Sequence, residues 1–209
     1  MSAVVQAHAG SDQTDVPSIV RGAVKLGLFE SVIVLLFSLV SRHLNGLVEV
    51  TLESVILAIG VIGVIALPGL WTRARTIEGI AGAAGIGLAA AWIFLLVDVA
   101  ILQPIGTYTH RWLDIGGGAN WWYHPVWWMT GTFMSWMGAW VLAGQTASRG
   151  EPSVPMLVGL VAVFDVVFAA IAVVVHVPHA GWTVGTFGVA VLPALALSMI
   201  VTQLGARRR

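Results

Sequence analysis

Five histidine and aspartate side chains in the second half of the chain are candidates for binding a transition metal. Two of them, in His176-Val-Pro-His179, lie three positions apart. The other three are His110, Asp114 and His124. Imidazole and carboxylate groups are ordinary ligands of zinc, copper and iron, and histidine also holds haem. This pattern suggests a metal or haem site, although the spacing matches no established signature and the histidines could instead contact headgroups, water or a partner.

Three acidic side chains lie within apolar stretches. Asp165 stands near the middle of one such stretch, and Asp98 and Glu30 lie toward the ends of two others. A carboxylate in the middle of a membrane costs about 2.5–3.5 kcal/mol, so such a residue is a functional candidate. Together the three could pass a proton or cation across the bilayer. The alternative is that they stay protonated or bind a nearby hydroxyl, since burial favours the neutral form.

Trp136 and Trp140 are separated by four positions, so they share one face of a helix. Met129, Phe133 and Met137 run beside them. The two tryptophans could form a wall for a flat cofactor, quinone or pigment. The alternative is ordinary packing or lipid contact, because aromatic side chains commonly fill cores.

Composition excludes several kinds of chemistry. Lys25 is the only lysine, and it precedes the first apolar core, so a retinal Schiff base is excluded. The chain has no cysteine, which excludes thiolate metal sites and cysteine-held iron–sulfur clusters. The formal net charge is zero, so there is no basic footprint for nucleic acid.

The elements that must position these residues are long apolar segments. Hydrophobic residues make up 58% of the 209 residues and charged residues only 10%, against roughly 25% charged in soluble domains. A segment of about 20 apolar residues spans the bilayer, and it must be helical because lipid offers no hydrogen bonds. Six such segments are expected, at Leu26–Val40, Leu52–Leu70, Ile80–Leu102, Pro125–Gly144, Val154–Val175 and Val184–Leu204. The sequence predicts an all-α integral membrane protein, a bundle of six transmembrane helices.

The positive charges give the expected orientation in the cell membrane. Eight of the ten lysines and arginines share one side, namely Arg21, Lys25, Arg73, Arg75, Arg149, Arg207, Arg208 and Arg209. Only Arg42 and Arg111 lie on the other. Because short cytoplasmic loops are rich in lysine and arginine, both termini are expected in the cytoplasm. The candidate metal ligands and the long aromatic-rich loop from Gln103 to His124 are then extracytoplasmic.

The chain divides into two expected parts. Residues 1–20 are polar and form a mobile tail, and residues 21–209 form one six-helix domain. The expected third helix is rich in glycine, including Gly79, Gly82, Gly85 and Gly87, which favours close approach of neighbouring helices.

Three functional hypotheses follow. The first is a subunit of a larger, redox-linked membrane complex, with the His/Asp metal or cofactor site at its extracytoplasmic face and other membrane subunits as partners. The second is a proton- or cation-coupled carrier of a small solute, in which Asp165 is the coupling acid and Asp98 and Glu30 give access to it. The third is a scaffold that holds neighbouring subunits or pigments. The sequence does not decide whether the protein is an enzyme.

Overall fold

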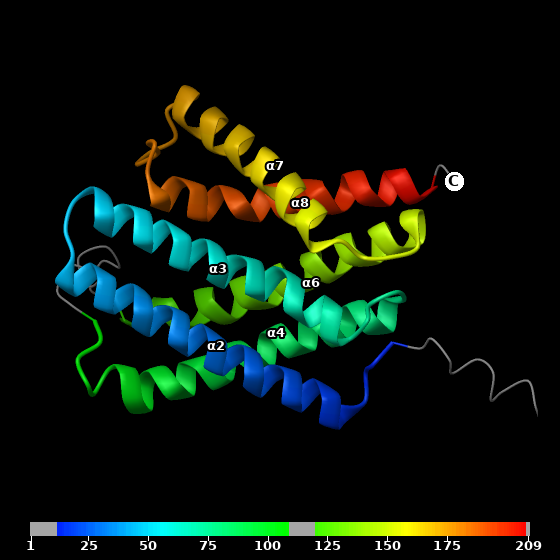
Figure 1. Cartoon of the computed structure of the whole chain (residues 1–209), viewed down its shortest axis with the longest axis horizontal. Helices are drawn as coiled ribbons and strands as arrows, with labels where there is room; N and C mark the ends of the chain where they lie inside the picture. Colours follow the sequence, from blue (N-terminus) through cyan, green and yellow to red (C-terminus); the bar gives the residue numbers. More distant parts are fainter. Residues whose placement is uncertain (1–11, 109–119, 208–209) are drawn as a thin grey trace, which may run out of the picture.

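The chain folds into a bundle of long helices (Figure 1). The computed structural model describes residues 12–108 and 120–207, without the side chains of residues 120–125 and 207. This part of the chain is all-helical and has no strand. Its six α-helices are α2 (Val16–His43), α3 (Leu47–Trp71), α4 (Ile77–Val97), α6 (Asn120–Arg149), α7 (Val154–Val174) and α8 (Val184–Arg207). A short π-helical segment, η1 (Asp98–Leu102), continues α4.

Of the six helices that the sequence predicts to span a membrane, five are long and apolar enough to do so, and the sixth span stays a prediction. They are α2, α3, α7, α8 and the continuous unit of α4 with η1. The exception is α6, which is 30 residues long but carries glycine, threonine, serine and tryptophan along its length. These helices indicate a multi-pass membrane protein, whose exposed apolar side chains contact lipid.

Both described ends of the chain lie at one end of the bundle (Figure 1). We call this the terminal end, where α2 begins and α8 ends, and we call the opposite end the loop end. Helix α6 packs against α3, α4 and α8, while α2 packs against α3 and α4. Helices α7 and α8 form a hairpin. The core therefore lies around α6, with Leu142, Val141 and Leu195 among its fully buried side chains.

The helices begin earlier or end later than their apolar cores because polar residues cap them. The Asp15 carboxylate accepts a hydrogen bond from the Ser18 amide at 3.1 Å, so α2 begins at Val16, within the stretch expected to be a tail. Ser153 caps α7 in the same way at Met156. Helix α6 begins at Asn120, before the expected start at Pro125, which shortens the long loop at its second end.

Two glycines allow the central helices to touch. At Gly138 of α6, a Cβ atom would overlap the carbonyl oxygen of Ile65 in α3. At Gly87 of α4, it would overlap the Ser135 side chain of α6. The expected close approach of the glycine-rich helix is confirmed at Gly87, whereas a Cβ at Gly85 would meet no atom within 4 Å. These contacts hold α3, α4 and α6 together as small residues do in membranes.

Helix α7 is held mainly by its partner α8 and by its own first turn. The amide of Ser153 donates a hydrogen bond to the Gln145 side chain of α6 at 2.7 Å. Few residues of α7 are buried, and these include Leu157 and Val161 near its beginning. In Figure 1, α7 diverges from α3 toward the loop end. A space between the two helices follows from this divergence and contains the candidate site.

Candidate functional site

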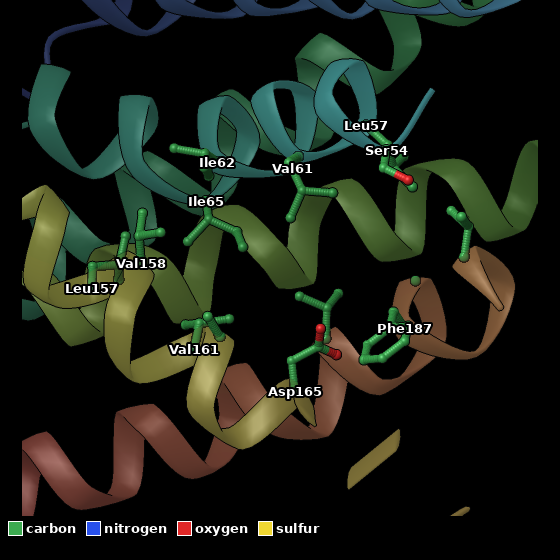
Figure 2. A pocket seen from close by; sticks show the side chains of 15 residues that line it. Ser54, Leu57, Val61, Ile62, Ile65, Leu157, Val158, Val161, Asp165 and Phe187 are labelled. Atoms are coloured by element: carbon green, nitrogen blue, oxygen red, sulfur yellow. The ribbon is translucent and has the colours of Figure 1, made fainter. Parts of the chain in front are cut away.

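A cavity of about 340 Å³ lies between α3, α7 and α8. Figure 2 shows its lining side chains converging from the three helices. Most of the lining is aliphatic: Leu57, Ala58, Val61, Ile62 and Ile65 of α3, Leu157, Val158, Val161 and Ala162 of α7, and Val184, Gly188 and Val191 of α8. The remaining three lining residues are Ser54, Asp165 and Phe187.

Asp165 provides the only carboxylate among the described residues that line this cavity. Its side chain is half-buried, and its Oδ1 atom is buried without a hydrogen-bond partner among the described residues. In Figure 2 the carboxylate points into the cavity. Because an unpaired buried polar atom costs free energy, this arrangement is typical of a group kept for a ligand. Asp165, a candidate from the sequence, thus lies in the lining of a cavity, and its role stays a prediction.

The other polar side chain of the cavity is Ser54. Its hydroxyl donates to the Val50 carbonyl at 2.7 Å, so its hydrogen is used within α3 and its oxygen still has capacity to accept. The Phe187 ring lies on α8 and, like Asp165, is directed into the cavity in Figure 2. Sequence reasoning missed both residues, because neither a serine nor a phenylalanine in an apolar helix carries a signal of its own.

The charged groups of the neighbouring helices do not line the cavity. On α3 these are Glu49 and Glu53 and on α6 Arg149, and none belongs to the lining set. The side chain of His124, at the start of α6, lies outside the described part of the chain. Asp165 is therefore the sole titratable group among the residues that line the cavity.

Glu30 is a second buried acid in a different place. It lies on α2, is 7% exposed, and its Oε2 atom has no hydrogen-bond partner among the described residues. It is absent from the cavity lining. Since α2 packs against α3 and α4 while α7 packs mainly against α8, the structure does not bring Glu30 and Asp165 into one site.

Asp98 is fully buried in η1, but its carboxylate has partners. Gln103 donates to Oδ2 at 2.7 Å, and the Tyr108 hydroxyl donates to Oδ1. Nearby, Ser38 and Arg42 of α2 donate to the backbone carbonyl of Thr107. These bonds fasten the 103–108 segment to the helices, so Asp98 has a structural role here that needs no ligand.

The histidine hypothesis rests largely on residues outside the described part. His110 and Asp114 lie in the 109–119 gap, and the side chain of His124 is not described. His176 and His179 follow the end of α7, where both are exposed and have positive φ angles of 58° and 64°. Among the described residues, no three histidine, aspartate or glutamate side chains are grouped so as to hold a metal ion. The metal and haem site stays a prediction, which elemental analysis of a His110→Ala/His124→Ala variant tests.

The two candidate aromatic residues form a tilted pair on α6. The ring centroids of Trp136 and Trp140 are 5.8 Å apart, with 35° between the ring planes. Trp140 packs against the core around Leu142, while Trp136 is 40% exposed. Neither lines the cavity that contains Asp165. Trp136 is therefore the member of the pair that meets the surroundings of the bundle.

Comparison with known proteins adds no relative. The chain matches no protein-family model, no curated protein and no solved structure.

Proposed function

We propose that the protein is a proton- or cation-coupled membrane carrier of a small solute, with the cavity between α3, α7 and α8 as its binding site. The observation that carries the proposal is the Oδ1 atom of Asp165, which has no hydrogen-bond partner among the described residues and lies in a mostly apolar cavity. Ligand sites are typically concave, mostly apolar and supplied with a few placed polar groups. The cavity has this composition.

Asp165 gives the proposed carrier its coupling. A carboxylate in apolar surroundings is stable when it is protonated or when it pairs with a cation. The affinity of the site for the solute therefore differs between the protonated and the ionised form of Asp165. This difference in affinity couples binding of the solute to binding of the ion. Glu30 and Asp98 are not needed for this step, because neither lines the cavity.

The proposed carrier has both termini in the cytoplasm and crosses the membrane six times. Arg73 and Arg75 lie in the turn between α3 and α4, and Arg149 ends α6, all at the terminal end. From the positive-inside rule we expect that end in the cytoplasm. The divergence of α7 from α3 then opens the cavity toward the extracytoplasmic half of the membrane.

Uptake into proteoliposomes tests the proposal. The full-length protein is reconstituted, and three labelled probes are offered: the cation benzyltrimethylammonium, the zwitterion phenylalanine and the neutral sugar ribose. A proton gradient of either direction, or a sodium gradient, is imposed. We expect at least one probe to enter faster than into protein-free vesicles and only while a gradient exists. Asp165→Asn abolishes this uptake.

Two glycine variants provide a matched control for the site. A Cβ atom at Gly188, in the cavity, or at Gly159, on the exposed surface of α7, would meet no atom within 4 Å. Gly188→Leu therefore adds a side chain that starts in open space at the cavity lining, while Gly159→Leu adds the same side chain away from it. We expect uptake to be lost only in Gly188→Leu. Uptake of no probe under any gradient, or equal uptake by wild type and Asp165→Asn, contradicts the carrier.

A further inference from the structure

We infer that the solute of this cavity is a small organic cation: an ammonium group beside Asp165 and Phe187, joined to an apolar body that lies against the aliphatic walls. The inference rests on the proposed function, since it names the substrate class of the same site. It is argued from the polar groups, the aromatic ring and the size of the cavity.

The polar groups of the cavity are too few for most other ligands. An inorganic cation such as Na⁺ or Ca²⁺ is held by several oxygen ligands, typically 6–8 for Ca²⁺. The described lining supplies the Asp165 carboxylate and the Ser54 hydroxyl. A sugar would leave most of its hydroxyls unpaired, which is costly in apolar surroundings. An anion would be repelled by Asp165 itself.

An organic cation fits the same set of groups. Its charge is satisfied by one carboxylate, and its carbon substituents need no hydrogen bonds. The Phe187 ring, directed into the cavity with Asp165, offers the negative face that attracts ammonium groups. Val61 and Val158 belong to the facing aliphatic walls, which suit the rest of such a molecule.

The cavity also limits the size of the solute. Its volume of about 340 Å³ is at the lower end of the roughly 300–1,000 Å³ typical of ligand pockets. Leu157 and Val191, both buried, belong to its lining. A single-ring amine is therefore suitable, and a large multi-ring cation is not.

Protons compete with this solute for one group. The Asp165 carboxylate carries one negative charge, so it holds either one proton or one monovalent organic cation. Among the described residues no other titratable side chain lines the cavity, and Glu49, Glu53 and Arg149 lie outside its lining. One cation moving in one direction is thereby exchanged for one proton moving in the other. Acidification weakens binding of the cation.

Equilibrium dialysis with labelled benzyltrimethylammonium tests the inference on the full chain in nanodiscs. This probe cannot release a proton, so its charge is fixed. We expect saturable binding that weakens at least about tenfold in Asp165→Asn and in Gly188→Leu, with Gly159→Leu unchanged. Unlabelled neopentylbenzene has the same shape without the charge, and it should compete at least about tenfold less well. Sodium chloride and benzenesulfonate should not compete.

Three results overturn the inference: no saturable binding, equal binding by Asp165→Asn, or equal competition by neopentylbenzene. The last of these would identify the cavity as a site for neutral lipid-like molecules. The outcome is separate from that of the carrier. Gradient-driven uptake of phenylalanine or ribose that needs Asp165, without binding of the cation, leaves the carrier and removes the substrate class. Binding of the cation without gradient-driven uptake of any probe leaves the substrate class and removes the carrier.

Discussion

Asp12 accepts hydrogen bonds from both the backbone amide and the hydroxyl of Thr76, 64 positions further along the chain. It also accepts from the amides of Arg75 and Gly79, at 3.0 Å each. The segment before α2 thus caps the beginning of α4. Partial burial opposes the charged form of Asp12, but these hydrogen bonds outweigh burial and hold the pKa of its carboxyl below the ordinary 3.8.

Replacing Asp12 by asparagine should lower stability at neutral pH. By analogy with other helix caps, the loss is about 0.5–2 kcal/mol, and partial exposure places it toward the lower end. Because the folded-state pKa lies below the unfolded one, the stabilisation is complete above about pH 4 and disappears as the pH falls through the folded-state value. Thermal unfolding in detergent from pH 7 to pH 2.5 measures the difference between variant and wild type.

The control for Asp12 is Glu151→Gln, which changes an exposed acid in the turn between α6 and α7. It should leave the melting temperature unchanged. A difference between Asp12→Asn and wild type that is as large at pH 2.5 as at pH 7 would argue against the cap.

Gly138→Ala should destabilise the protein strongly, because the added methyl group would overlap the carbonyl oxygen of Ile65. Overpacking of this kind costs typically 1–3 kcal/mol, and a backbone atom cannot move aside as a side chain can. Gly131→Ala, two turns earlier on α6, is the matched control, since its nearest contact would be an ordinary 3.6 Å. Melting temperatures in one detergent compare the two variants. Equal tolerance of both would contradict the close approach of α3 and α6.

Tyr108→Phe should cost about 1–3 kcal/mol, because it removes a donor from the fully buried Asp98 carboxylate. A double-mutant cycle with Asp98→Asn measures the coupling between the two side chains. We expect the loss in the double variant to be smaller than the sum of the two single losses. Strict additivity would show that the hydroxyl and the carboxylate do not interact in solution.

Asp165→Leu should raise stability, by about 1–2 kcal/mol, because it replaces an unpartnered polar atom with an apolar side chain in an apolar cavity. Asp98→Leu should lower stability, because Gln103 and Tyr108 lose their acceptor. Chemical denaturation in mixed micelles compares the two. A loss of stability in Asp165→Leu would mean that the carboxylate already has a structural partner.

The helices were predictable because their apolar cores are long and unbroken, as in Val154–Val174. Their ends were less so. The start of α2 at Val16 depends on the Asp15 cap, and the start of α6 at Asn120 precedes its first proline. Hydropathy identifies where a helix crosses lipid, whereas the ends depend on individual hydrogen bonds.

The candidate site was predictable only in part. A mid-helix acid such as Asp165 is visible in sequence because it conflicts with its apolar neighbours. The cavity around it arises from the divergence of α7 and α3, which depends on tertiary packing and leaves no local pattern. The surroundings of the acids also differ for tertiary reasons, since Asp98 has donors from Gln103 and Tyr108, whereas Oδ1 of Asp165 has none among the described residues.

The space between α3 and α7 has one more consequence. Ala58 and Ala162 line the cavity and are exposed halfway along their helices, where a spanning helix faces hydrocarbon. The opening of the cavity at these two residues therefore faces lipid as well as water. For an amphipathic solute that dissolves in the bilayer, the concentration that governs binding is then its concentration in the membrane. Occupancy of the cavity then rises with the oil–water partition coefficient of the solute. In a homologous series with lengthening alkyl chains, the apparent affinity would follow partitioning into the bilayer more closely than it follows the fit of each solute to the cavity.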